Sequence, residues 1–264
     1  MAFLAVSWER DKASVTLRLN RPESLNALTQ GIRAELLEGL QKADQDSEVR
    51  VVILRGTGRA FSVGQDLKEL TDYYQSRGPV MGELVQKEYI PIVKALRELS
   101  KPSVAVVEGA AVGGGMALAL ATDFRIISDW AQLVPAFVKV GLAPDTGTTF
   151  LLARSIGYAR ALSICMTGQA LAAPDLVRLG LADHAYPSGE ELENALAALT
   201  AELAQGPTAA YVAIRRLFDR TVGLPLDDVL MAERDTQDAL ARTRDHQEAV
   251  EAFLSKRNPR FRGE

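Results

Sequence analysis

The sequence predicts an α/β core followed by a helical C-terminal region, and two observations carry this prediction. Up to about residue 155, strand-like runs alternate with helical runs, a pattern typical of crossover units around a parallel sheet. From about residue 188 onward, amphipathic helical segments follow one another with no strand-like run between them. No long linker divides the two parts, so we expect a core over residues 1–190 and a helical region over residues 191–264.

The strand-like runs of the core are short and apolar. Residues 3–9 and 14–20 flank the tetrapeptide "RDKA", which predicts a hairpin. Three later runs are predicted strands: residues 49–56, 101–109 and 123–130. The first of them is a continuous apolar stretch of the kind found in buried parallel strands.

The helices are predicted from apolar residues that recur at helical spacing. In the core this spacing is found over residues 29–46, 90–100 and 113–122. In the C-terminal region it is found over residues 189–205, 207–222, 225–242 and 244–257. Residues 68–86 are polar and aromatic, and they fit either a mobile loop or a broken helix.

The composition is that of an ordinary soluble globular protein, with 264 residues of which 47% are hydrophobic and 24% charged. A formal net charge of -4 gives no electrostatic case for nucleic acid or an anionic membrane as a partner. Cys165 is the single cysteine, which excludes an intrachain disulfide and suits a reducing compartment. Charges near the start argue against a secretory signal, and no apolar run suits a membrane span. We therefore expect a cytoplasmic protein.

The sequence offers few residues that could bind a metal ion. The chain has two histidines, His184 and His246, and neither lies in a motif with ligand spacing. No metal site is expected.

Two glycine-rich turns follow predicted strands, where α/β proteins tend to place ligands. Glycines 113–115 leave amide N–H groups free at a helix start, although tight helix–sheet packing also needs small residues. No dinucleotide fingerprint is present, because Leu118 stands where its last glycine belongs. Gly64 opens the second turn, in which Asp66 by itself fits a helix cap. Two amides that converge from such turns are what an oxyanion hole requires.

Asp145 is the third candidate. It follows an apolar run, Val138 to Pro144, that we expect to be buried, and it precedes a predicted helix. An aspartate in this place is most often a helix cap. The alternative is a catalytic acid/base, and the neighbouring residues alone leave both open.

Four segments together resemble the crotonase (enoyl-CoA hydratase/isomerase) superfamily: "NRPESLNAL", "GRAFSVGQDL", "KPSVAVVEGAAVGGGMALALATDFRI" and "FVKVGLAPDTGTTFLLARSIG". They occur in the family's order and spacing across nearly the whole chain. The resemblance implies a spiral of ββα units that binds an acyl-CoA thioester and catalyses over residues 1–190. It implies a helical trimerisation region over residues 191–264, in a homotrimer or a dimer of trimers. No cofactor is implied beyond the coenzyme A carried by the substrate.

The resemblance also implies roles for named residues. The two amides that hold the thioester enolate are those of Gln65 and Gly114. Hydratases of the family carry two glutamates where this chain has Ala117 and Ala136, so ordinary hydration is in doubt. The "PD" motif, the "GQD" turn and the ending "AFLSKRNPRF" resemble the subset that contains ring-1,2-epoxyphenylacetyl-CoA isomerases. In that subset the residue matching Asp145 is the sole acid/base. The resemblance thus implies an isomerase that converts ring-1,2-epoxyphenylacetyl-CoA to the oxepin-CoA and shifts a 3-enoyl-CoA to the 2-enoyl-CoA.

Substrate contacts are implied at further positions by the same match. They are Leu25, Ala27, Gly64, Asp66, Lys68, Gly113, Phe137, Leu142, Phe253 and Lys256. Phe253 and Lys256 would reach the nucleotide bound to a neighbouring subunit, although Lys256 equally fits a solvated charge in the last turn of a helix. Tyr73 and Tyr74 either contact the acyl group or are exposed loop tyrosines.

Other functions of the family fit less well. Its dehalogenases use an aspartate at this point with a tryptophan and a histidine, but here Phe137 replaces the tryptophan and the histidine is missing. Two alternatives stay open: an enoyl-CoA hydratase-like lyase, and a catalytically silent acyl-CoA-binding subunit.

Overall fold

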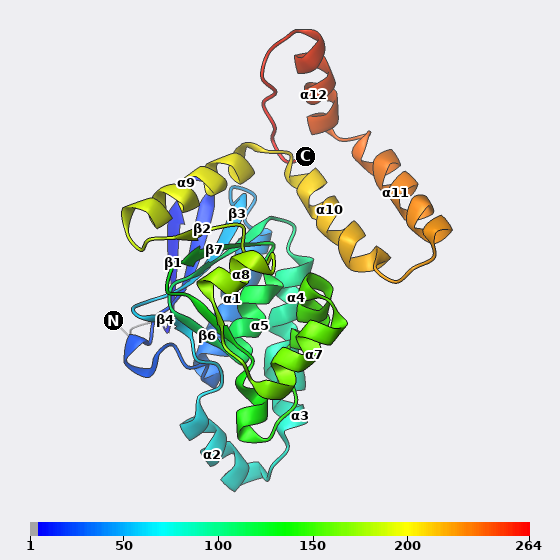
Figure 1. Ribbon diagram of the computed structural model, residues 1–264. Coiled ribbons are helices and arrows are strands. Elements are labelled where there is room, and N and C mark those ends of the chain that lie inside the picture. Colours follow the sequence, from blue (N-terminus) through cyan, green and yellow to red (C-terminus); the bar gives the residue numbers. More distant parts are fainter. Residues whose placement is uncertain (1–4) are drawn as a thin grey trace.

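The computed structural model describes residues 5–264, in which a six-stranded sheet and a four-stranded sheet are covered by helices (Figure 1). The larger sheet has the strand order β1-β2-β3-β5-β7-β10, and the smaller has the order β4-β6-β8-β9. The larger sheet consists of β1 (Val6–Asp11), β2 (Ser14–Leu19), β3 (Val51–Gly56), β5 (Ser103–Val107), β7 (Phe124–Ser128) and β10 (Ala185–Tyr186). The smaller consists of β4 (Ala60–Ser62), β6 (Ala110–Val112), β8 (Gln132–Val134) and β9 (Leu171–Ala172).

The predicted hairpin is confirmed, since β1 pairs antiparallel with β2 and Val6 lies opposite Leu19. Phe3 and Leu4, the start of the predicted first strand, lie outside the described residues. The remaining pairs of the larger sheet are parallel, as the alternation of strands and helices predicted.

The smaller sheet was missed by the sequence reasoning. Each of β3, β5 and β7 is followed along the chain by a three-residue strand that pairs in the second sheet, namely β4, β6 and β8. Strands this short carry too few residues to show an alternating pattern. The repeated two-strand step is the ββα arrangement that the resemblance implied.

The predicted helices are all present, with further short ones between them. They are α1 (Gln30–Gln45), α2 (Leu67–Arg77), α3 (Met81–Leu84), α4 (Ile90–Glu98), α5 (Gly114–Ala121), α6 (Thr148–Ile156), α7 (Tyr158–Thr167), α8 (Ala173–Arg178), α9 (Glu190–Gln205), α10 (Thr208–Thr221), α11 (Leu226–Leu240) and α12 (Arg244–Leu254). Residues 68–86 form the broken helix, not the mobile loop. The break lies at Gly78, which has a φ of +76° and precedes Pro79.

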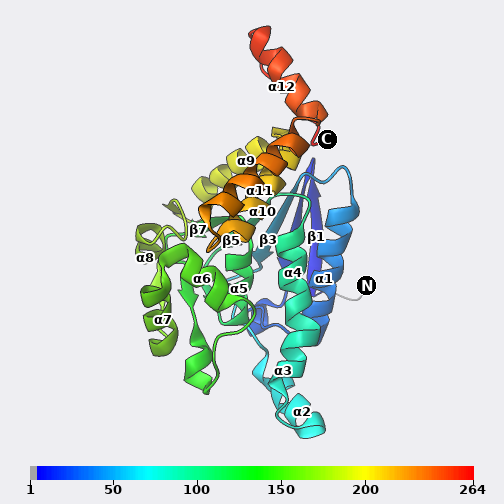
Figure 2. The same ribbon diagram turned by 90° about the vertical axis from the view of Figure 1, so that its right-hand side faces the viewer.

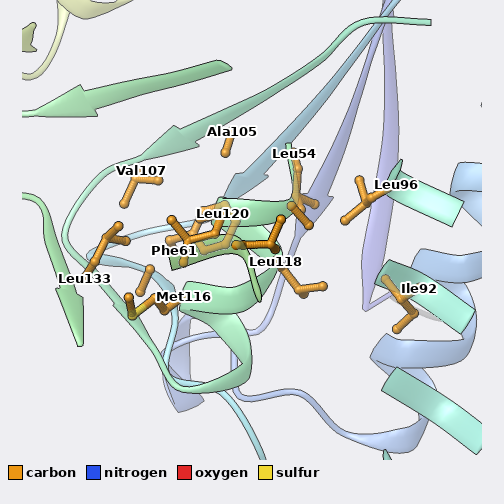
Figure 3. Close-up of a cluster of buried hydrophobic side chains, with 14 of the residues drawn as sticks. Leu54, Phe61, Ile92, Leu96, Ala105, Val107, Met116, Leu118, Leu120 and Leu133 are labelled. Carbon is orange, nitrogen blue, oxygen red and sulfur yellow. The ribbon is translucent and has the colours of Figure 1, made fainter. Parts of the chain in front are cut away.

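The core is centred on α5, every residue of which is buried. Figure 3 shows Met116, Leu118 and Leu120 of this helix packed among apolar side chains of both sheets and of α4. The opposite face of the larger sheet is covered by α9, whose leucines pack on β3, β5 and β7. Because both faces are buried, these strands are mostly apolar.

The last three helices form the C-terminal region, of which α11 and α12 leave the body of the molecule. Figure 1 shows α11 and α12 projecting beyond the sheets, and both views place α12 and α2 at opposite ends of the molecule (Figures 1 and 2). Large apolar side chains on this region stay exposed in the single chain, among them Phe218, Leu226 and Leu254.

A buried ion pair fastens α10 to the core. Arg215 donates to the Asp123 carboxylate at 2.8 Å and to the backbone carbonyls of Lys101 and Leu99. The Arg215 side chain is 5% exposed. Its removal would leave the partly buried Asp123 carboxylate and two carbonyl oxygens without this donor.

We therefore expect Arg215→Met to lower the free energy of unfolding by about 3 kcal/mol. Chemical denaturation followed by circular dichroism measures this loss. Arg216→Met is the matched control, because Arg216 is exposed and should change stability by less than about 0.5 kcal/mol. Equal losses in the two variants would show that the buried pair does not hold this helix.

Candidate active site

A cavity of about 660 Å³ lies beside the ends of β4 and β6 and is bounded by α2 and by the segment 136–145. All three residues predicted to be catalytic line it: Gln65, Gly114 and Asp145. So do seven of the ten predicted substrate-binding residues: Ala27, Gly64, Asp66, Lys68, Gly113, Phe137 and Leu142. The fold therefore brings together residues from four separate stretches of the chain.

Three predicted binding residues do not line this cavity. Leu25 has a left-handed backbone with a φ of +54°, and its carbonyl accepts the N–H of Val63 at 3.1 Å, so it shapes the turn beside the cavity. Phe253 is 81% exposed near the end of α12, and Lys256 follows that helix, at the end of the molecule away from α2 (Figure 1). Within one chain these two cannot touch a ligand in the cavity, and their contact with a neighbouring subunit's ligand stays a prediction.

The Gln65 amide is aimed by a single parallel bridge to Leu28. The Leu28 N–H donates to the Gly64 carbonyl at 2.7 Å, and the Asp66 N–H donates to the Leu28 carbonyl at 3.3 Å. In extended backbone, successive N–H groups point to opposite sides. The Gln65 N–H, between these two bonded groups, therefore points away from Leu28.

The Gly114 amide is the first N–H of α5, which has no partner within the helix. Gly113 donates instead to the Val134 carbonyl at 2.9 Å, which holds the turn. The two turns are in contact, since a Cβ atom built on Gly64 would lie 3.2 Å from the Gly114 nitrogen. The turns that carry the two backbone amides therefore lie side by side in the cavity lining.

The glycine run also serves packing. A Cβ atom on Gly115 would lie 2.4 Å from the Ser62 carbonyl oxygen, so this residue allows α5 to approach β4. The two explanations offered by the sequence thus apply to different glycines: Gly114 to the amide and Gly115 to the close helix–strand contact.

Asp145 is not a helix cap. The capping position of α6 is Gly147, and the Asp145 carboxylate accepts a hydrogen bond of 2.6 Å from the Thr146 hydroxyl. Burial raises the pKa of Asp145 above its ordinary value, and the bond from Thr146 only partly offsets this effect. Within the described residues no cation pairs with this carboxylate.

Asp145 differs from the other two carboxylates that line the cavity. Glu23 has a side chain that is 70% exposed. Asp66 is desolvated, but it accepts a hydrogen bond from Arg21 at 3.1 Å and caps α2, so the net effect lowers the pKa of Asp66. The prediction that Asp66 caps a helix is therefore correct, and Asp145, with its raised pKa, is the stronger base of these two carboxylates.

The run before Asp145 is less buried than expected. It forms a 3-10 turn over Ala136–Val140, and the side chains of Val138 and Val140 are 40% and 57% exposed. The apolar pattern arises because Val140 and Leu142 line the cavity wall instead of the protein core.

Tyr74 lines the cavity and Tyr73 packs against the core. Both are half-buried on α2, so the exposed-loop reading was wrong. Sequence reasoning also missed Tyr89, which lines the cavity and is 2% exposed. Tyr89 ends a five-residue π-helical turn, Val85–Tyr89, which has no sequence signature that would have revealed it.

Ala117 is fully buried and Ala136 lines the cavity, so neither position supplies a second acid there. Across residues 5–264 no three His, Cys, Asp or Glu side chains gather as a metal site would require. A membrane-crossing helix is likewise absent from that part of the chain.

Comparison with known proteins agrees with this geometry. The model of the family "Enoyl-CoA hydratase/isomerase" matches residues 9–264. A protein of Escherichia coli K12 named 1,2-epoxyphenylacetyl-CoA isomerase is 37% identical over 253 residues, covering 96% of each chain. A probable enoyl-CoA hydratase of Rhodobacter capsulatus is 36% identical over 263 residues, covering 100% of each.

Solved structures extend the likeness to the fold. The crystal structure of a putative enoyl-CoA hydratase/isomerase from Mycobacterium abscessus superposes with a TM-score of 0.91 at 36% identity. The match covers 97% of this chain and 99% of the other. Fold, sequence and family model agree over nearly the full length. The chain therefore has the crotonase fold and is an enzyme of the enoyl-CoA hydratase/isomerase family.

Proposed function

We propose that this enzyme is an acyl-CoA isomerase that uses Asp145 as its one acid/base and the amides of Gln65 and Gly114 as an oxyanion hole. The observation that carries the proposal is the cavity itself, in which one unpaired carboxylate with a raised pKa shares the space with two free backbone amides. One carboxylate is enough for an isomerase, since no water is added. The alanines at 117 and 136 leave a hydratase without its two acids.

The reaction moves one proton. The Asp145 carboxylate removes the acidic proton next to the thioester carbonyl, and the electron pair passes to the carbonyl oxygen. The Gln65 and Gly114 amides stabilise this enolate, because fixed donors in a dry site favour the charge as it develops. The protonated Asp145 then returns the proton further along the conjugated system, which for a 3-enoyl-CoA gives the 2-enoyl-CoA.

For the substrate we propose ring-1,2-epoxyphenylacetyl-CoA, with the ring expanding to the oxepin as the proton is returned. The cavity suits an aromatic group, because much of its lining is apolar, including Leu70, Tyr74, Met81, Phe137, Val140 and Leu142. The Escherichia coli relative bears the name of this activity.

Coenzyme A would lie at the cavity mouth near Ala27 and Lys68, where the ammonium of Lys68 suits a phosphate. We further propose a cytoplasmic homotrimer, or a dimer of trimers, with no cofactor besides the coenzyme A of the substrate. The exposed apolar side chains of the C-terminal helices support assembly, since patches of this kind mark contact surfaces. Phe253 and Lys256 would then reach a neighbouring subunit's nucleotide.

The test mixes the purified enzyme with a 3-enoyl-CoA and follows conjugation of the double bond by ultraviolet absorbance. The isomerase proposal expects turnover without loss of the conjugated product to water. Gain of a 3-hydroxyacyl-CoA would favour the hydratase-like alternative. Tight binding of acyl-CoA without any turnover would favour the silent subunit.

The raised pKa of Asp145 predicts how the stability of the fold depends on pH. The raised pKa means that the folded state binds this proton more tightly than the unfolded state does. Wild-type stability therefore falls as pH rises from the ordinary value of 3.8 through the raised value in the folded state. Asp145→Asn removes this penalty and keeps an acceptor for the Thr146 hydroxyl. We expect the variant to unfold at a higher temperature than wild type at pH 7 and at the same temperature near pH 3.

Melting curves of both proteins across this pH range measure the effect. A variant less stable than wild type at pH 7 would contradict the assignment of a desolvated, unpaired carboxylate.

A further inference from the structure

One side chain touches both amide turns of the cavity. The Tyr89 hydroxyl donates to the Gln65 side-chain carbonyl at 2.8 Å. The ring of Tyr89 also covers Gly114, since a Cβ atom built on that glycine would lie 3.1 Å from the Tyr89 Cε1 atom. Tyr89 therefore lies between the turn that carries one amide and the helix start that carries the other.

The backbone at Tyr89 is unusual. The π-helical turn Val85–Tyr89 is inserted between α3 and α4, and π turns inside helices often mark functional sites. A π turn places one extra residue in the helix and so changes the direction in which the following side chains point. Here the residue at its end is 2% exposed and lines the cavity.

A buried arginine, Arg33, contacts both Tyr89 and Gln65. The Arg33 guanidinium lies 5.1 Å from the centre of the Tyr89 ring and donates to the Gln65 side-chain carbonyl at 3.1 Å. It also donates to the Leu28 carbonyl, the acceptor of the bridge that aims the Gln65 amide.

The charge of Arg33 is matched within this network. Its guanidinium donates to Glu69 at 2.7 Å and to Glu88 at 2.8 Å, and its side chain is 1% exposed. Helix α1, the start of α2 and the π turn are joined through this one group. A network that is buried and fully bonded holds its members rigid.

We propose that Tyr89, held by Arg33, is a positioning residue that fixes the distance and direction between the two amides of the oxyanion hole. This role rests on the proposed function and goes beyond it, because Tyr89 takes no part in the proton transfer and acts by positioning the two amides. An oxyanion hole works only where both donors are fixed before charge develops, since reorientation during the reaction would cost part of the stabilisation. Burial raises the pKa of Tyr89, so its hydroxyl stays protonated and donates.

The first test is Tyr89→Phe, which keeps the ring over Gly114 and removes the hydrogen bond to Gln65. We expect kcat for 3-enoyl-CoA isomerisation to fall about tenfold, the size of one hydrogen bond lost in the transition state, and KM to change less than about twofold. Tyr158→Phe makes the same chemical change at an exposed tyrosine away from the cavity and should leave kcat unchanged. Melting temperatures would check that wild type and both variants are folded.

A spectroscopic reading separates positioning from a purely structural role. Acetoacetyl-CoA forms an enolate that absorbs in the near ultraviolet, and an oxyanion hole increases the enolate fraction of the bound ligand. We expect Tyr89→Phe to bind acetoacetyl-CoA with unchanged affinity but with a smaller enolate fraction than wild type. A structural role alone would lower affinity and melting temperature and leave the enolate fraction of the bound ligand unchanged.

The partner of the hydrogen bond is tested by Gln65→Met, which removes the acceptor and keeps the backbone amide. The double variant should lose no more activity than the more affected single variant, because both changes break the same bond. Losses that simply add would overturn the proposal, and so would a Tyr89→Phe variant with wild-type kcat and enolate fraction. If wild type itself neither isomerises a 3-enoyl-CoA nor enolises bound acetoacetyl-CoA, the proposed function fails instead.

Discussion

Replacing Asp145 by asparagine should lower the isomerisation rate by about 10²- to 10⁴-fold, the range of a positioned acid/base. Asparagine has nearly the same shape and can still accept the hydrogen bond from Thr146, but it cannot take up a proton. The affinity for an acyl-CoA should therefore stay within a few-fold of wild type. Initial rates with a 3-enoyl-CoA, together with a binding titration against an unreactive acyl-CoA, measure the two effects separately.

The control for this variant is Asp183→Asn, since Asp183 is exposed and does not line the cavity. It should retain the wild-type rate. If Asp145→Asn keeps more than about a tenth of the wild-type rate, the proton is carried by another group and the mechanism is wrong.

Replacing Gly64 by alanine should lower the rate by about 10²- to 10³-fold, the typical cost of losing one oxyanion donor. Gly64 has a φ of +81°, and a Cβ atom there would lie 2.6 Å from the Val112 carbonyl oxygen and 3.2 Å from the Gly114 nitrogen. Neither neighbour is the end of a flexible side chain, so the backbone of one turn must shift. Such a shift moves the Gln65 amide relative to the Gly114 amide.

Gly78→Ala separates the two effects of that substitution. Gly78 has a φ of +76°, so the backbone strain of an alanine is similar, but no atom lies within 4 Å of its added Cβ. We expect both variants to lose some stability and only Gly64→Ala to lose turnover while still binding acyl-CoA. Equal turnover in the two variants would mean that the amides are not arranged for catalysis.

The parts of the fold that the sequence predicted are those with strong local patterns. The long parallel strands are apolar runs, and the C-terminal helices carry apolar residues at helical spacing, so these patterns are visible without the structure. The strands β4, β6 and β8 have three residues each, and their pairing is decided by neighbours far along the chain. Local patterns carry no information of that kind.

The site was predictable at positions where the backbone conformation requires a particular residue, such as glycine. Gly64 and Gly113 both have positive φ, and glycine is the residue that takes this conformation at little cost. Tyr89 was not predictable, because its role depends on a π turn and on contacts with residues from two other segments. Phe253 and Lys256 match the family's motif but lie away from the cavity of their own chain. Their contact with a ligand bound to a neighbouring subunit stays a prediction.

The proposal as a whole is tested most directly by hydrogen exchange at the carbon next to the thioester. Phenylacetyl-CoA has such a carbon and no double bond to shift, so it isolates proton removal from the rest of the reaction. In deuterium oxide, wild type should incorporate deuterium at this carbon, as nuclear magnetic resonance would show, and Asp145→Asn should not. Equal incorporation by both proteins, or none by a wild type that isomerises a 3-enoyl-CoA, would contradict proton transfer through Asp145.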